Sequence, residues 1–586
     1  MNTTTKKTAP CTPGILTFSM VAAAAVVLAL PMLLHGPLAQ GHDATEHINF
    51  ARHFSEQFWR GELCPRWLAG MNRGLGSPTF FVFPPFPSYV YALLEPAGKI
   101  LHFNAFNMGE FLALLGSGLC ASLWLSTMAS QRVACTGAIL YMLMPYHLAV
   151  DYYRRTALPE CWAFVWMPLV LYFSARAMRR ERVYLPGLAL AYAFLILSHL
   201  ITVFIFSLIP LAAALTLSAQ GQKVKSALRI AGGMVLGTGL SCFYLVPALF
   251  HARYFPASRL YPWSFVQDNL IAIGTPLHAG GFVHAISLTV LAMIALGGLC
   301  SVIVFAKGGK DSKTKVLFWL AVCVIPVFLM FRLSFPVWKM CPLLFAAIQF
   351  PWRLNIVLCL AVLSMVTVFL SEAPRLPRWS QALSLVLVVT LIVPWFMAYG
   401  DIWRRYRMEA AYPAEAVPLV PHVDDHDGWF SAWSPPGIDE RKAIDASTGP
   451  QVRFLTGEGT ANVLLWKPRH IEFQANSATG GWVMIRQFYY PSWRAALVGP
   501  DKASPDQTLG IDIKAAMPEG LLELQVPPGR QQIQLEIPIG RAERIGYWIS
   551  VIFAFLCAGV AWRQRRESRN LPRLPSPNCR ASETAR

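Results

Sequence analysis

The chain has 586 residues, of which 55% are hydrophobic and 14% are charged, and its formal net charge is +18. This composition excludes a soluble globular protein, because the core of a single soluble domain stops growing at about 250–300 residues. The basic residues stand in short clusters between long apolar runs, which indicates orientation in a membrane rather than a nucleic-acid partner.

Apolar runs long enough to cross a bilayer recur along the chain, since about 18 nearly uncharged residues suffice as a helix. The first run follows Lys6 and Lys7 and is interpreted as a retained signal-anchor. Only one of 84–102 and 105–127 is counted, which gives about twelve transmembrane helices. The spans are predicted at 15–34, 84–102 or 105–127, 133–150, 160–178, 185–199, 201–217, 230–250, 283–306, 316–332, 353–370, 381–399 and 544–562.

The basic residues between the spans predict the orientation of the chain. They gather in every second connection, for example at 176–182 and 307–315, and such connections face the cytoplasm. Both termini, 1–14 and 563–586, are then cytoplasmic, and the second is predicted to be a disordered tail because it is polar and rich in proline.

The last extracytoplasmic segment, 400–542, differs in character from the spans. It loses the long apolar runs and alternates apolar and polar residues at 471–475, 521–526 and 532–537, with turn sequences such as Ala478-Thr-Gly-Gly between them. This pattern predicts an antiparallel, β-sandwich-like domain just before the last transmembrane helix, 543–562.

The first extracytoplasmic segment, 35–83, carries the strongest candidates for chemistry. It opens with the sequence GHDATEH at the membrane boundary. In a helix Asp43, Glu46 and His47 would share one face, and a carboxylate held there could deprotonate an acceptor hydroxyl. Capping of a juxtamembrane helix is the structural alternative. A divalent-metal site that includes His42 is a weaker hypothesis.

Arginines in the predicted extracytoplasmic segments are unusual, because basic residues are generally more frequent on the cytoplasmic side of a membrane protein. Arg154 and Arg155 lie in a short loop between two spans, and Arg353 lies at the mouth of another. Guanidinium groups gathered there suit a phosphate or diphosphate, which arginine binds in a bidentate manner. The alternatives are snorkelling to lipid headgroups and pairing with Asp151 and Glu160.

Several further residues are secondary candidates. They are His47, Glu160, His199 at the outer tip of a helical hairpin, and Gln349 in the run IQFPWR. The acidic turn 422–428 could ligate a divalent cation. The cysteines contain no CxxC pair that would indicate a zinc or redox site, and a disulfide between Cys64 and Cys341 is a weak hypothesis.

Several motifs in this order resemble a known family. They are HDATEH, PRWLAGMNRGLGSP, YYRRTALPE, IQFPWR and the C-terminal QFYYPSWRAAL. Together they resemble the bacterial membrane proteins called 6-pyruvoyl-tetrahydropterin synthase-related, which are akin to the YfhO-like proteins. The histidine triad of the soluble pterin synthase is absent from the sequence, so the label does not imply that activity.

The resemblance implies a GT-C-type architecture for 15–399, similar to glycosyltransferases that use polyprenyl-phosphate-linked sugars, in a bacterial cytoplasmic membrane. In such enzymes an acidic residue of the first outer loop serves as base or metal ligand. That role falls here on Asp43, with Glu46 as its neighbour. The chain departs from many GT-C enzymes in lacking an adjacent Asp-Glu or Asp-x-Asp pair at this place, which leaves metal dependence open.

We therefore expect a transferase that moves a sugar from a polyprenyl-phosphate donor to a lipid or envelope glycan on the outer face of the membrane. Asp43 would activate the acceptor hydroxyl, and Arg154, Arg155 and Arg353 would stabilise the leaving phosphate. No cofactor is required, although a divalent metal is an open alternative, and the partners are the donor, the acceptor and membrane lipids, with no nucleic acid. The alternatives are a transporter or flippase of a lipid-linked glycan, which the lack of an evident repeat disfavours, and a non-catalytic envelope-assembly protein.

Overall fold

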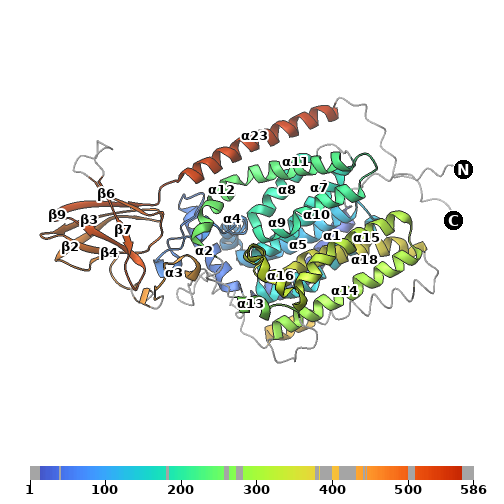
Figure 1. The fold of residues 1–586 in the computed structure, drawn as a ribbon, viewed down its shortest axis with the longest axis horizontal. Helices are drawn as coiled ribbons and strands as arrows, with labels where there is room; N and C mark the ends of the chain where they lie inside the picture. Colours follow the sequence, from blue (N-terminus) through green and yellow to red (C-terminus); the bar gives the residue numbers. More distant parts are fainter. Residues whose placement is uncertain are drawn as a thin grey trace.

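The computed structural model places a β-domain at one end of a bundle of long helices, and a single helix, α23, runs from that domain along the bundle (Figure 1). The structure describes residues 14–37, 41, 43–179, 184–256, 263–271, 281–375, 382, 399–407, 430–439, 442–443, 445, 447–498 and 509–569.

Nine of the described helical segments are long and apolar enough to cross a membrane, and the bent pair α11–α12 would make a tenth. The nine are α1 (Ile15–His35), α5 (Ala105–Leu125), α6 (Gln131–Leu143) with η2 (Tyr146–Arg155), α7 (Leu158–Met178), α9 (Leu200–Phe206) with α10 (Leu208–Leu217), α14 (Gly281–Lys307), α15 (Lys310–Met330), η6 (Pro351–Leu354) with α18 (Asn355–Glu372), and α23 (Arg541–Arg569). The prediction of many transmembrane helices is thus confirmed, whereas the count of about twelve stays a prediction.

The remaining predicted spans differ in several ways. Of the pair 84–102 and 105–127, both form helices, α4 (Phe86–Leu101) and α5, but only α5 is among the membrane-spanning candidates. The span predicted at 185–199 is the shorter apolar helix α8 (Leu185–Ser198). Most of the span predicted at 381–399 lies outside the described residues.

Three sequence predictions are wrong where the structure describes them. The short loop predicted to hold Arg154 and Arg155 is helical as far as Arg155, because η2 follows α6 after a break at Met144. The predicted span 230–250 is broken into α11 (Lys223–Leu240) and α12 (Cys242–His251), which meet at 73°. The tail predicted as disordered from 563 begins as helix, because α23 runs on to Arg569 through residues that favour helices.

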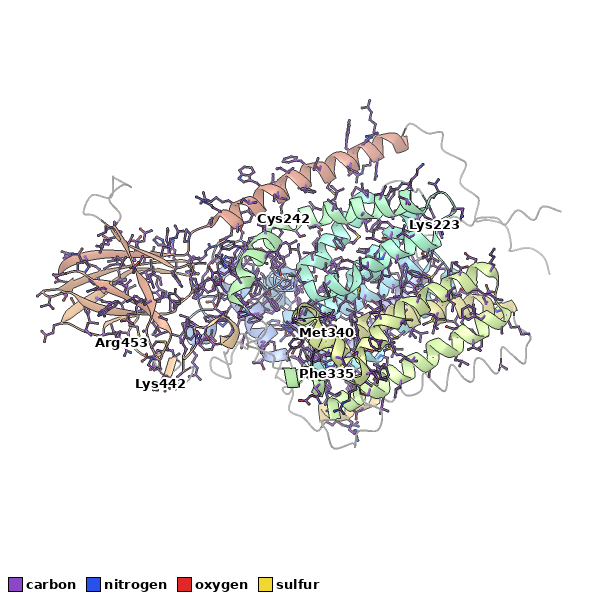
Figure 2. All side chains as sticks on the ribbon, viewed as in Figure 1. Lys223, Cys242, Phe335, Met340, Lys442 and Arg453 are labelled. Carbon is purple, nitrogen blue, oxygen red and sulfur yellow. The ribbon has the colours of Figure 1, made fainter. Side chains whose placement is uncertain are left out.

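Short helices occupy the connections at the ends of the bundle. They are α2 (Ala44–Trp59), α3 (Met71–Gly74), η1 (Thr79–Phe81), η3 (Ala252–Tyr254), α13 (Trp263–Asp268), η5 (Arg332–Ser334), α16 (Phe335–Met340), α17 (Pro342–Ile348), η7 (Ala373–Arg375) and α21 (Phe430–Trp433). Figure 2 places Lys223, at the start of α11, at the bundle end remote from Lys442 and Arg453 of the β-domain. A basic connection and the β-domain therefore lie at opposite ends of the bundle, and the orientation of the chain in a membrane stays a prediction.

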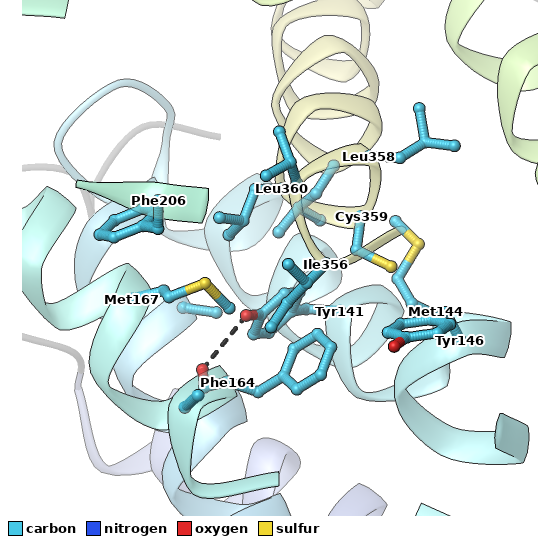
Figure 3. Packing of buried hydrophobic residues seen from close by; sticks show 14 of the residues in the cluster. Tyr141, Met144, Tyr146, Phe164, Met167, Phe206, Ile356, Leu358, Cys359 and Leu360 are labelled. Atoms are coloured by element: carbon cyan, nitrogen blue, oxygen red, sulfur yellow. Dashed lines mark hydrogen bonds between the residues drawn. The ribbon is translucent and has the colours of Figure 1, made fainter. Parts of the chain in front are cut away.

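The core of the bundle is built around α18. This helix is apolar on all sides, and 89% of its membrane-spanning window is buried, which is the behaviour of a helix enclosed by others. In Figure 3 its residues Ile356 and Leu360 lie near Tyr141 of α6 and Phe164 of α7. The Tyr141 hydroxyl donates to the main-chain oxygen of Phe164 at 3.1 Å, so the buried phenol is satisfied within this core.

The β-domain consists of two antiparallel sheets with strand orders β1-β4-β8-β7 and β2-β3-β9-β5-β6. The strands are β1 (Val452–Phe454), β2 (Gly459–Lys467), β3 (His470–Ser477), β4 (Gly481–Phe488), β5 (Arg494–Val498), β6 (Leu509–Ile511), β7 (Ile513–Ala515), β8 (Leu521–Val526) and β9 (Gly529–Glu536). Buried residues of both sheets form one apolar cluster. The strand patterns read at 471–475, 521–526 and 532–537 are confirmed as β3, β8 and most of β9.

The first loop completes the core of this β-domain, which the sequence did not predict. Trp67 donates its indole N–H to Oε1 of Gln487 at 2.9 Å, and Gln487 donates through Nε2 to the carbonyl of Gly74 at 2.7 Å. The main-chain N–H of Phe488 donates to the carbonyl of Leu75 at 2.7 Å. Because Trp67 and Leu75 are fully buried in the β-domain core, this loop fixes the domain to the bundle.

Candidate functional site

Charged side chains from segments far apart in the sequence meet around Arg155. Its Nη2 donates to Oδ2 of Asp43 at 2.8 Å, and its Nη1 donates to Oδ1 of Asp151 at 2.6 Å and to Oε2 of Glu160 at 2.7 Å. Nε of Arg353 lies 3.7 Å from the same oxygen of Glu160. We call these five residues the ion cluster.

The ion cluster is positioned by an uncommon helix. η2 is a π-helix, a form that occurs mostly as short insertions and often at functional sites. It carries Asp151 and Arg155 four residues apart and ends at Thr156, whose φ of 56° and ψ of 49° are left-handed. A β-branched residue avoids this conformation, so the backbone is strained where it leaves the cluster.

A second strained residue lies beside Arg353. Gln349 has φ 65° and ψ −57°, the rare γ-turn conformation. Its Oε1 accepts from Nη1 of Arg353 at 2.5 Å, so the turn holds the guanidinium in place. Backbone strain that persists beside buried charges is typical of functional sites.

Asp43 occupies the N-cap position of α2, yet its side chain makes no capping hydrogen bond. Its main-chain N–H donates to the carbonyl of Arg155 at 2.8 Å, and its carboxylate accepts from the Arg155 guanidinium. The side chain of Asp43 is 19% exposed, whereas those of Asp151 and Glu160 are 0% and 2% exposed. Asp43 is therefore the carboxylate through which the cluster reaches the surface.

His47 lies one turn after Asp43 on α2. Its Nδ1 lies 2.8 Å from the carbonyl oxygen of Thr156. A carbonyl oxygen can only accept, so Nδ1 carries the proton and donates the hydrogen bond. In the neutral ring Nε2 is then the acceptor nitrogen. Burial lowers the pKa of His47 below 6.5, and the charges of Arg155 and Arg353 lower it further against the opposing effect of Asp43. His47 is consequently a neutral base at neutral pH.

The cluster has more carboxylates than guanidinium groups. Asp43, Asp151 and Glu160 are three carboxylates and Arg155 and Arg353 two guanidinium groups, so the five side chains together carry a formal charge of −1 when all are ionised. Both terminal nitrogens of Arg155 are engaged, which is the pairing alternative read from the sequence. Nε of Arg353 is buried and has no hydrogen-bond partner in the part of the chain that the structure describes.

The remaining predicted residues fall around this centre. Glu160 is a central member, and its Oε1 accepts from the hydroxyl of Tyr146 at 2.8 Å. His199 lies in the break between α8 and α9, within electrostatic range of Glu160, and its Nδ1 pairs with the hydroxyl of Thr202 at 2.7 Å. Glu46 and Arg154 are partly exposed neighbours of cluster residues along the chain.

The metal predictions find no geometric support among residues that are described. Within these residues no group of three or more histidine, cysteine, aspartate and glutamate side chains could hold a metal ion. The guanidinium of Arg155 occupies the space between the cluster carboxylates. His42 and the turn 422–428 lie outside the described residues, and Cys64 and Cys341 are both free thiols.

Sequence reasoning missed three contributors to the site. Tyr146 was not singled out, Asp151 was considered only as a partner for the arginines, and Trp352 lies with its ring 5.0 Å from the Arg155 guanidinium. The spacing of Asp151, Arg155 and Glu160 within nine residues was the available signal, because charges placed so closely inside an apolar stretch must be paired.

Comparison with models of protein families identifies a family. A model of the family described as "6-pyruvoyl-tetrahydropterin synthase related domain; membrane protein" matches residues 80–408, which is more than half of the chain. The matched region includes Asp151, Arg155, Glu160 and Arg353 and begins after Asp43. No curated protein matches the chain.

Proposed function

The chain belongs to the 6-pyruvoyl-tetrahydropterin synthase-related family of membrane proteins, and on this premise we propose that it is a GT-C-like glycosyltransferase. It moves a sugar from a polyprenyl-phosphate donor to a lipid or envelope glycan on the outer face of the bacterial cytoplasmic membrane. The β-domain is then periplasmic and both termini are cytoplasmic. The observation that carries this proposal is a buried network of charges that reaches the surface at one carboxylate, Asp43.

The proposed reaction is a single displacement at the sugar. Asp43 takes the proton of the acceptor hydroxyl, whose oxygen then bonds to the anomeric carbon as the bond from that carbon to the phosphate oxygen breaks. The phosphate leaves with the bonding electrons and gains negative charge. Arg353, together with Arg154, would bind that charge.

Arg155 takes a role different from the one that the sequence indicated. Its terminal nitrogens hold Asp43 to the buried carboxylates, so it positions the base and keeps it ionised. His47 is the alternative base, since its Nε2 is an acceptor. The two candidates differ in their pH dependence, because each base loses activity as the pH falls through its own pKa, and a carboxylate keeps its activity to a more acidic pH than an imidazole, although the pKa of His47 itself lies below 6.5.

The test compares Asp43→Asn with Asp311→Asn in the purified full-length protein reconstituted into liposomes. Asp311 is 82% exposed and serves as the matched control. The donor is first identified as the lipid-linked sugar that accumulates in a deletion strain. We expect Asp43→Asn to slow transfer by about 100-fold or more and Asp311→Asn to leave it unchanged. Equal rates for Asp43→Asn and the wild type would overturn the assignment.

One observation favours a second candidate, a transporter or flippase of the lipid-linked glycan. Glu110 of α5 is 0% exposed, and neither carboxylate oxygen has a hydrogen-bond partner among the described residues. An intramembrane acid of this kind is typical of proton-coupled transport. In a deletion strain a donor trapped on the inner face would favour flipping, and a donor that accumulates on the outer face would favour transfer.

A further inference from the structure

We propose that a cavity between the bundle and the β-domain binds a phosphate-bearing headgroup, at a site separate from the ion cluster. The cavity has a volume of about 590 Å³, within the range of small-molecule sites. Its walls come from α12 and η3, from the end of the β4–β5 loop, and from the start of α23. We call it the junction pocket.

The charge of the junction pocket indicates an anionic ligand. Four arginines line it: Arg253, Arg494, Arg541 and Arg544. All four are exposed, and none forms an ion pair in the described part of the chain. Glu543 is the one carboxylate in the lining, and it is already bound by Arg66 at 3.1 Å and by Arg469 at 3.0 Å. The positive charge of the pocket is therefore left for a ligand.

The floor of the pocket is aromatic. The rings of Phe81 and His251 stack with centroids 4.2 Å apart, and Nδ1 of His251 pairs with the hydroxyl of Tyr490 at 2.6 Å. Arg253 lies over the rings of Phe250 and Tyr254, at 4.1 and 4.8 Å from their centroids. This surface suits a phosphate attached to a glycerol or sugar unit. The guanidinium groups can bind the phosphate, and the flat aromatic rings can pack against the glycerol or sugar.

The position of the pocket fits a lipid headgroup. Arg541 and Arg544 are in the first turn of α23, a candidate span whose window is only 11% buried, and α12 belongs to another candidate. Figure 1 shows the start of α23 and α12 side by side where the bundle meets the β-domain. The phosphates of lipid headgroups lie where membrane spans end. Snorkelling would explain basic residues at the end of one helix, whereas the arginines of this pocket come from three separate segments around a cavity.

The chemistry alone would also admit a soluble phosphate ester. Both sources share a phosphate monoanion or dianion that several guanidinium groups can bind with charge-assisted hydrogen bonds. The experiment must therefore offer the phosphate in both forms to the full chain. It must also separate loss of binding from loss of folding.

The full-length protein is reconstituted into phosphatidylcholine nanodiscs with and without phosphatidylglycerol, and its Tm is measured. In separate samples glycerol 3-phosphate is added to nanodiscs without the anionic lipid. The variant is Arg541→Gln with Arg544→Gln, and the matched control is Arg530→Gln, on an exposed strand position outside the pocket. An unchanged Tm in plain phosphatidylcholine shows that each variant is folded.

We expect phosphatidylglycerol to raise the Tm of the wild type and of Arg530→Gln, and the double variant to bind it about tenfold more weakly. A rise with glycerol 3-phosphate alone would identify a soluble ester as the source. The absence of a rise with either probe, or an equal loss in Arg530→Gln, would overturn the proposal. Asp43→Asn should keep the full response, so failure of the proposed transferase function and failure of this site are distinguishable.

Discussion

Two buried ionic groups of this protein look alike in composition and differ in design. In the ion cluster one guanidinium, Arg155, is bonded to three carboxylates inside the bundle. At the junction one carboxylate, Glu543, is bonded to two guanidinium groups, those of Arg66 and Arg469. In the ion cluster the carboxylates outnumber the guanidinium groups, and at the junction the guanidinium groups outnumber the carboxylate. The first group lies inside the bundle, and the second lies where the bundle meets the β-domain.

The surroundings of the two groups show what each is for. At the junction, Arg66 also donates to the carbonyl of Phe243 at 2.6 Å and Arg469 to those of Ile537 and Pro538 at 3.0 Å, so the bonds tie the first loop, α12 and the β9–α23 linker together. The ion cluster instead lies beside a π-helix and two residues with strained backbone, Thr156 and Gln349. Bonds that join three separate segments indicate a structural attachment, whereas buried charges beside strained backbone are typical of a functional site.

The largest effect is expected from Arg155→Met. It leaves Asp151 and Glu160 buried without their guanidinium, which should lower the free energy of unfolding by about 3–5 kcal/mol. The Tm of the purified protein and its abundance in the membrane measure this. Adding Asp151→Asn and Glu160→Gln should restore much of the loss, because the uncompensated charges are then gone. A Tm within experimental error of the wild type would refute the buried pairing.

A smaller effect is expected at the junction from Glu543→Gln. The substitution leaves the buried Arg66 without its carboxylate but with its carbonyl partner, so we expect a loss of about 2 kcal/mol. The consequence should be local, seen as faster proteolysis of the β9–α23 linker at 537–540 while the bundle keeps its Tm. Slower or unchanged cleavage would show that the ion pairs do not fasten the domain.

Gly76→Ala tests the attachment of the first loop to the β-domain. An added Cβ would lie 2.3 Å from the ring of Trp67 and 2.8 Å from Oε1 of Gln487, at a φ of +90°. The clash and the backbone strain together should cost about 1–3 kcal/mol. Gly74→Ala is the control, since its φ is +85° but no atom lies within 4 Å, so it reports strain alone. Equal losses of Tm in the two variants would mean that the packing of Trp67 contributes nothing.

The smallest effect is expected from the titration of His47. Its folded pKa lies below 6.5, so the unfolded chain binds this proton more tightly and stability falls as the pH drops below about 6.5. His47→Gln removes this pH-dependent contribution to stability. The Tm of the variant should therefore depend less on pH in the acid range than the Tm of the wild type. Parallel curves for the two proteins would contradict the burial of this ring. Above pH 7 the substitution should leave the pH dependence unchanged.

The predictions that held depend on local pattern. Apolar runs such as those of α14 and α18 mark spans because hydrocarbon admits only a continuous helix there. The alternation in β3, β8 and β9 marks strands because one face of each is buried. Asp43, Arg155 and Glu160 could be singled out in advance because charges near a membrane span are rare, and their roles in catalysis stay predictions.

The sequence by itself determined that this is a membrane protein of many helices with a β-domain before the last one, because hydrophobic period and charge are local properties. Only the tertiary structure decided that Asp43 joins Asp151 and Glu160 at Arg155 instead of capping α2, and that the first loop completes the β-domain core. Those outcomes depend on contacts between residues more than a hundred positions apart. The broken helix α11–α12 and the π-helix η2 follow from packing in the same way, and no local period encodes them.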